Sequence, residues 1–387
     1  MAEPILSPDG KWMWTGSDWI PAPPSSSQSA NVNLQDSVVG GDINITQNNA
    51  EDIATAMVQA LERMGFSDQS SPAELTPSQE AEVEQVLEMS EQLAGHGIEI
   101  DPWTEITLGN AAKLAGRTHS AQQHYLRALG TFRKNGDQQG EGASLRKIGN
   151  IANTRGDLDE AERLYHESLA IMREIGDLQG VGDSMGNLGT IASKRGDLAE
   201  AERLYRESMA IKREIGDRKG EGDSLHNLGT IAETRGDLAE AERLYRESLA
   251  IKREIGDRQG EAYSLNNLGT IVEKRGDLAE AEQLHRESLA IRREIGDREG
   301  EAYSLIGLGN IAKARGGLAE AERLYRESLA VEREIGNRQG EAYSLINLGN
   351  TLLNRNEDER HRCYTEAVRI QREIGVPIQQ WFIDNGY

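Results

Sequence analysis

The tripeptide Arg-Gly-Asp, which cell-adhesion receptors recognise, recurs in this chain at a constant interval. Its four copies stand at residues 155–157, 195–197, 235–237 and 275–277. The next copy reads Arg-Gly316-Gly317, where an adhesion ligand would lose recognition but a turn would keep a tolerable helix N-cap. The tripeptides are therefore interpreted as turns: Gly196 would end one helix in the left-handed conformation and Asp197 would cap the next, with Glu200 completing a capping box.

Three further patterns could carry chemistry. The glycine-rich stretch 180–186 is similar to a dinucleotide-binding loop, but such a loop must follow a strand, and helical sequence precedes it here. His119 and His124 would lie about 140° apart on a helix, and no acidic or cysteine partner completes a metal site. No Ser, His and Asp set is identifiable. The chain is predicted to have no catalytic residues, no metal site and no cofactor.

A 40-residue internal repeat explains the regular spacing. A glycine preceded by Leu or Ile marks each copy, at Gly149, Gly189, Gly229, Gly269, Gly309 and Gly349. A fixed period of this length is typical of repeat arrays. Each copy holds two segments joined by the Gly-Asp turn, and in both segments apolar residues recur every three or four positions with charged residues between them. Both segments are predicted to be amphipathic helices.

These units resemble the long form of the tetratricopeptide repeat, about 40 residues in length, that is typical of kinesin light chains and Pins-type scaffolds. In one copy Leu268-Gly269 lies in the first helix, Ala281 follows in the second, and the ring of His285 comes four residues later, where other copies have tyrosine. The resemblance implies that the small residues allow close helix packing and that the ring fills the wedge between hairpins. Seven repeats over residues 101–375 predict an all-α, right-handed solenoid. The family binds proteins in most known cases.

The resemblance also implies that the first helices line a concave groove. Several positions that would face it carry Asn or Thr, and an asparagine amide both donates and accepts hydrogen bonds, so a ladder of them can bind the backbone of an extended peptide. The candidate groove residues are Arg146, Asn150, Asn187, Thr190, His226, Asn227, Thr230, Tyr263, Asn266, Asn267, Thr270, Tyr303, Asn310, Tyr343, Asn347 and Asn350. The alternative is that the asparagines bridge neighbouring first helices or face water.

The character of this groove changes along the array. Its N-terminal end is charged, with Arg146, Lys147, Asp183 and Asp223, and its C-terminal end is apolar and aromatic, with Tyr263, Tyr303, Ile306, Tyr343 and Ile346. The expected partner is a protein that presents an extended segment with basic and apolar residues. A carboxylate clamp of the kind found in some family members is not favoured, because Asp223 stands where a basic residue would be needed.

The first hundred residues differ in composition from the repeats. Trp12, Trp14 and Trp19 predict a Trp-rich β-hairpin with a turn at 15–18. Residues 31–47 alternate about a Gly-Gly pair and predict a second hairpin with unpaired edges, through which we expect a homo-oligomer to form. Helices are predicted at 51–64 and from residue 77 to about 94, the latter opened by a capping box. The predicted divisions are a Trp-rich segment with linker at 1–24, an oligomerisation segment at 25–72 and a packing helix at 73–100. The repeats follow at 101–375 and a C-terminal cap at 376–387.

Composition argues against several classes of partner. The 387 residues include 43 Lys and Arg against 65 Asp and Glu, a net charge of −22, which disfavours nucleic acid and anionic membranes. Cys363 is the only cysteine, so no intrachain disulfide can form. Without a secretory signal or a long apolar run, a cytoplasmic location is expected. The sequence predicts a scaffold or adaptor that binds an extended peptide; the alternative is a self-assembling structural protein.

Overall fold

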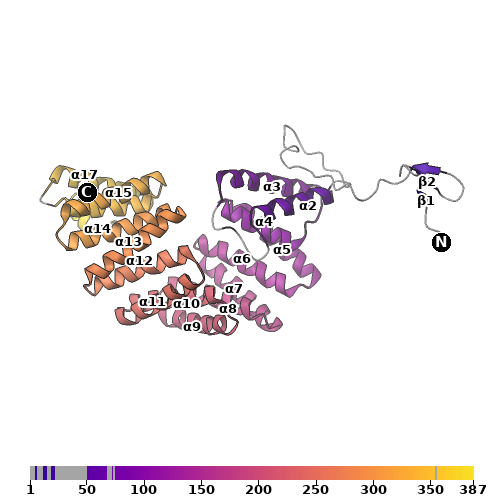
Figure 1. Cartoon of the computed structure of the whole chain (residues 1–387), viewed down its shortest axis with the longest axis horizontal. Coiled ribbons are helices and arrows are strands. Elements are labelled where there is room, and N and C mark those ends of the chain that lie inside the picture. Colours follow the sequence, from indigo (N-terminus) through magenta and orange to yellow (C-terminus); the bar gives the residue numbers. More distant parts are fainter. Residues whose placement is uncertain are drawn as a thin grey trace. The chain divides into compact units, whose positions relative to one another are not determined.

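The computed structural model describes residues 50–67, 72, 75–353 and 355–387, together with three short strands near the N-terminus (Figure 1). Strands β1 (Ile5–Leu6), β2 (Trp12–Trp14) and β3 (Trp19–Pro21) pair antiparallel in that order. The turn predicted at 15–18 and the hairpin predicted at 31–47 lie outside the described residues. Both hairpins as complete units, and self-association through the second, therefore stay predictions.

Among the described residues, two helices precede the repeats. They are α2 (Ala50–Arg63) and α3 (Pro77–Gly95). The predicted capping box opens α3: the Gln79 N–H donates to Thr76 Oγ1 at 3.3 Å, and the Thr76 N–H donates to Gln79 Oε1 at 2.9 Å. Helix α3 packs against α2 and against the first repeat helix, α4 (Pro102–Leu114).

Seven helix pairs follow in the described part of the chain, in agreement with the number of repeats that the sequence predicts. The first pair is α4 with α5 (Thr118–Asn135), and the remaining helices are α6 (Gln138–Thr154), α7 (Leu158–Ile175), α8 (Leu178–Lys194), α9 (Leu198–Glu214), α10 (Arg218–Thr234), α11 (Leu238–Glu254), α12 (Arg258–Lys274), α13 (Leu278–Ile295), α14 (Arg298–Ala314), α15 (Leu318–Glu334), α16 (Arg338–Thr351) and α17 (Glu357–Glu373). The short α18 (Gln380–Asp384) follows α17.

The chain forms two compact units, one ending at Ser144 and the other running from Leu145 to Tyr387. In the second unit, each helix from α8 to α16 packs against the helices before and after it along the chain. Successive first helices also touch one another, α8 with α10, α10 with α12, α12 with α14 and α14 with α16. The second unit is thus a helical solenoid whose first helices lie side by side, and this layer positions the candidate site.

The glycine and the aromatic ring that recur in the repeats pack against each other within one repeat. A Cβ added to Gly229 would lie 2.7 Å from a ring carbon of Tyr245, so the ring rests directly on the glycine backbone. The same contact recurs between Gly149 and Tyr165. These rings are fully buried, and burial raises the pKa of Tyr165 to about 12. Glycine and tyrosine together therefore set the distance between the two helices of a repeat.

The Arg-Gly-Asp tripeptides are turns between the paired helices, as predicted. Gly196 has a φ of +82°, and Asp197 caps α9 by accepting a hydrogen bond from the Glu200 N–H at 3.1 Å. The predicted return contact from Glu200 is wrong, because the Asp197 N–H already donates to the Ala192 carbonyl at 2.9 Å. The Glu200 carboxylate instead pairs with Arg203 at 2.6 Å.

Candidate functional site

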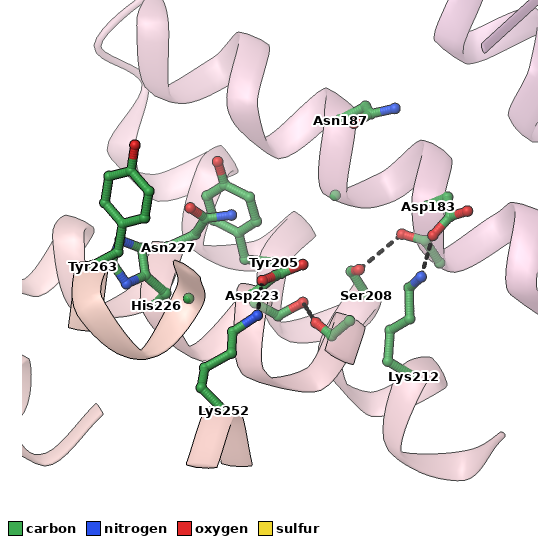
Figure 2. Close-up of a pocket in the computed structure, with 15 residues that line it drawn as sticks. Asp183, Asn187, Tyr205, Ser208, Lys212, Asp223, His226, Asn227, Lys252 and Tyr263 are labelled. Carbon is green, nitrogen blue, oxygen red and sulfur yellow. Dashed lines mark hydrogen bonds and ion pairs between the residues drawn. The ribbon is translucent and has the colours of Figure 1, made fainter. Parts of the chain in front are cut away.

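Two hollows open along the first helices of the second unit. The first, of about 490 Å³, is lined by residues of α8, α10 and α12 among others, and Figure 2 shows its side chains. The second, of about 470 Å³, is lined by residues of α12, α14 and α16 and by the end of α17. Nine of the predicted groove residues line them: Asn187, His226, Asn227 and Tyr263 in the first, and Asn266, Thr270, Tyr303, Asn310 and Tyr343 in the second. The other seven line neither: Arg146, Asn150, Thr190, Thr230, Asn267, Asn347 and Asn350.

The polar residues in the middle of the first helices bind tyrosine hydroxyls of their own repeats. Tyr325 donates to Asn310 Oδ1 at 2.7 Å, and the hydroxyls of Thr230 and Tyr245 lie 3.1 Å apart. The same contact is made at Asn150, Thr190 and Asn350. A buried hydroxyl without a partner would destabilise the fold. These side chains therefore hold the second helix in place, a role that the sequence analysis did not anticipate.

Some of the asparagines bridge neighbouring first helices, the alternative raised above. Asn187 Nδ2 donates to Asn150 Oδ1 at 3.3 Å, and Asn267 Nδ2 lies 3.3 Å from His226 Nε2. Burial lowers the pKa of His226, which favours the neutral ring that can accept this hydrogen bond. Asn227, by contrast, has no hydrogen-bond partner among the described residues and lines the first hollow. Its amide is available to a ligand.

Two buried lysines neutralise the acidic residues of the first hollow. Lys212 and Lys252, 5% and 3% exposed, reach Asp183 and Asp223 respectively (Figure 2). Each lysine also lies 2.9 Å from the aspartate that caps the following first helix. Lys212 contacts Asp217 in this way, and Lys252 contacts Asp257. Burial alone would raise the pKa of Asp217, but hydrogen bonds from the Gly220 N–H, Lys212 and Gln179 outweigh it and lower the pKa to about 2.

The Arg146 guanidinium adds to this neutralisation, lying 2.5 Å from Asp183. The N-terminal end of the groove is therefore charged in sequence but largely paired in structure. The buried cations were not predicted from the sequence, although the repeat itself carries the signal. Positions 172, 212, 252, 292 and 332 stand in register on the apolar stripe of the second helix and read Met, Lys, Lys, Arg and Glu.

Arg292 continues this series of cations. Its guanidinium carbon lies 4.8 Å above the ring of Tyr263, and Nη1 lies 3.2 Å from Asp297, the cap of α14. Tyr263 remains 47% exposed, and Tyr303 and Tyr343, at the same position of the next two first helices, are 43% and 50% exposed. Exposed aromatic rings at regular positions provide apolar contact area at low conformational cost.

The histidines that the sequence singled out are not a metal site. His124 is buried, and its Nδ1 lies 2.6 Å from Glu105, a contact that was not predicted from the sequence. Within the residues that the structure describes, no group of three or more His, Cys, Asp and Glu side chains could hold a metal ion. None of the described helices combines the length and apolarity needed to cross a membrane.

Stacked helix pairs with glycine, alanine and tyrosine at fixed positions define an α-helical repeat protein. The particular repeat is the tetratricopeptide repeat, whose family patterns match residues 140–214, 221–294 and 302–338. The chain is a tetratricopeptide-repeat protein. No curated protein sequence matches it.

Solved structures share this fold. A signal transduction ATPase with numerous domains from Pyrococcus horikoshii, which carries a tetratricopeptide repeat sensor, is similar with a TM-score of 0.63 and 15% identity over 86% of this chain and 48% of that chain. A Rap protein complexed with competence and sporulation factor is similar with a TM-score of 0.56 and 13% identity over 83% of this chain and 90% of the other. BtubC (BKLC) from P. vanneervenii gives 0.50 and 22%, over 57% and 92%. At these identities the likeness concerns the fold.

Proposed function

We propose that the chain is a non-enzymatic scaffold or adaptor that binds an extended peptide segment along the first helices of its second unit. Tetratricopeptide repeats generally bind other proteins and do not catalyse reactions. One protein of similar fold, a Rap protein, was solved in complex with competence and sporulation factor. The observation that carries the proposal is the row of exposed rings at Tyr263, Tyr303 and Tyr343, which line the two hollows on consecutive first helices.

The two halves of this groove would bind different parts of the peptide. In the first hollow, Asn227 offers an unpaired amide that can bind a peptide backbone, while Lys212 and Lys252 cancel the charge of the aspartates. In the second hollow, Tyr303 and Tyr343 offer aromatic contact. A segment whose apolar half lies in the second hollow fits this order, and basic residues in its other half suit the net charge of −22.

Selection from a random dodecapeptide library with the full chain as bait tests the proposal. The groove variant is Tyr303→Ala with Tyr343→Ala, and the matched control is Ile255→Ala with Ile335→Ala, which removes two exposed apolar side chains that line neither hollow. We expect the wild type and the control to enrich the same peptides and the groove variant to lose them. Enrichment by all three proteins alike would refute the groove, and enrichment by none would refute peptide binding.

A further inference from the structure

The series of buried cations ends in an acid. At the position of Lys212, Lys252 and Arg292, helix α15 carries Glu332, which is 0% exposed. Neither carboxylate oxygen of Glu332 has a hydrogen-bond partner within the usual distance among the described residues, and the nearby Asn337 side chain lowers the pKa of this carboxyl by less than burial raises it. A buried carboxylate without a partner is costly, because it loses its hydration without gaining a compensating contact.

The surroundings of Glu332 match those of Arg292 one repeat earlier. A Cβ added to Gly300 would clash with the Arg292 guanidinium, and a Cβ added to Gly340 would clash with the Glu332 carboxylate, so both charged groups rest on equivalent glycines. Arg292 extends further and covers the ring of Tyr263. Glutamate is shorter and negatively charged, so it cannot cover the ring of Tyr303 with a cation as Arg292 covers that of Tyr263.

The Glu332 carboxylate rests on Gly340, which lines the second hollow, but Glu332 does not itself line it. The second hollow is lined here by Tyr303, Gly340 and Tyr343. Burial raises the pKa of Tyr303, and the negative charges of Glu299 and Glu332 raise it further. Gln371 also lines the hollow, and its Oε1 is a second buried acceptor without a partner. The Glu332 carboxylate and Gln371 Oε1 could each accept a hydrogen bond from a ligand.

We propose that this part of the hollow, beside Tyr303, Tyr343 and Gly340, binds a lysine or arginine side chain of the bound peptide. The ligand's cation would take the place that Arg292 fills in the preceding repeat. It would pair with the Glu332 carboxylate while its charge lies against the tyrosine faces. This inference rests on the proposed peptide binding and adds to it the chemistry and the location of one specificity contact.

The test uses the same dodecapeptide library, the wild type and three variants. The site variant is Glu332→Lys combined with Asn337→Asp, which recreates the Lys252 and Asp257 pair and so supplies an internal cation that the fold already accommodates. Glu214→Lys is the control for charge, because it changes an exposed glutamate of α9. Glu332→Gln is the second site variant and keeps the shape of the side chain. Circular dichroism confirms that each variant is folded.

We expect wild-type selection to enrich Lys or Arg at one position of the selected peptides. We also expect the affinity of such a peptide to fall at least tenfold in both site variants and to change less than twofold in the control. Peptides selected without a basic position, or a basic preference that survives in the site variants, would overturn the inference while leaving peptide binding intact. Failure of the wild type to select any peptide would instead overturn the proposed function, and the inference with it.

Discussion

Replacing Glu332 by Gln should change how the stability of the C-terminal repeats depends on pH. Burial and the neighbouring charge of Glu299 raise the pKa of Glu332 from 4.5 to about 7. Because the folded state then holds this proton more tightly than the unfolded chain does, the group stabilises the fold below pH 4.5, and this contribution is lost as the pH rises through 7. The full difference is on the order of 3 kcal/mol.

About 2 kcal/mol of that difference falls between pH 5.5 and 8.5, by the same linkage relation. Glutamine has no proton to lose, so Glu332→Gln should lack this term, and other titrating groups cancel when the two proteins are compared. Hydrogen exchange measured by mass spectrometry on peptides from α15 and α16 reports the local opening free energy in this region. We expect wild type to lose about 2 kcal/mol relative to the variant over this range. Parallel pH dependences for the two proteins would refute the argument that Glu332 is buried without a partner.

Three other predictions concern the scaffold. Gly229→Ala would force a methyl group against Tyr245 and should destabilise the chain by about 1–3 kcal/mol in urea unfolding. Gly130→Ala, where the added Cβ meets open space, should instead stabilise it by about 0.5–1 kcal/mol. Equal effects of the two substitutions would refute the packing role of Gly229. Lys252→Met, which copies position 172, should cost about 1–3 kcal/mol by leaving Asp223 and Asp257 without their cation, and adding Asp257→Asn should restore part of the loss; no loss would mean that the cation is dispensable. Light scattering should find the full chain oligomeric and a chain starting at Pro72 monomeric, and self-assembly of the shorter chain would favour the structural alternative.

The repeat architecture was predictable because its determinants are local and recur. Gly196 and Asp197 specify a turn by themselves, and the spacing of Gly229 and Tyr245 repeats along the array, so each copy supports the interpretation of the others. Glu200 shows where local reasoning fails. The capping box needed a free Asp197 N–H, and a carbonyl of the preceding helix had already accepted it.

The candidate site was less predictable because its contacts join distant parts of the chain. Asn310 is a groove position in sequence, but the hydroxyl of Tyr325, fifteen residues later, occupies its side-chain oxygen. Lys252 joins Asp223 and Asp257, which lie 29 residues before it and 5 after it. The significance of Glu332 follows only when its position is compared with the cations of the earlier repeats in three dimensions.

The central claim is that a peptide binds along the first helices through the exposed tyrosines. The most direct measurement is the Kd of one selected, fluorescently labelled peptide, determined by anisotropy for wild type, for Tyr303→Ala with Tyr343→Ala, and for the Ile255→Ala with Ile335→Ala control. Loss of two central aromatic contacts of about 1–2 kcal/mol or more each predicts at least a thirtyfold weaker Kd for the tyrosine variant, with the control unchanged. A Kd within twofold of wild type in the tyrosine variant would contradict the account.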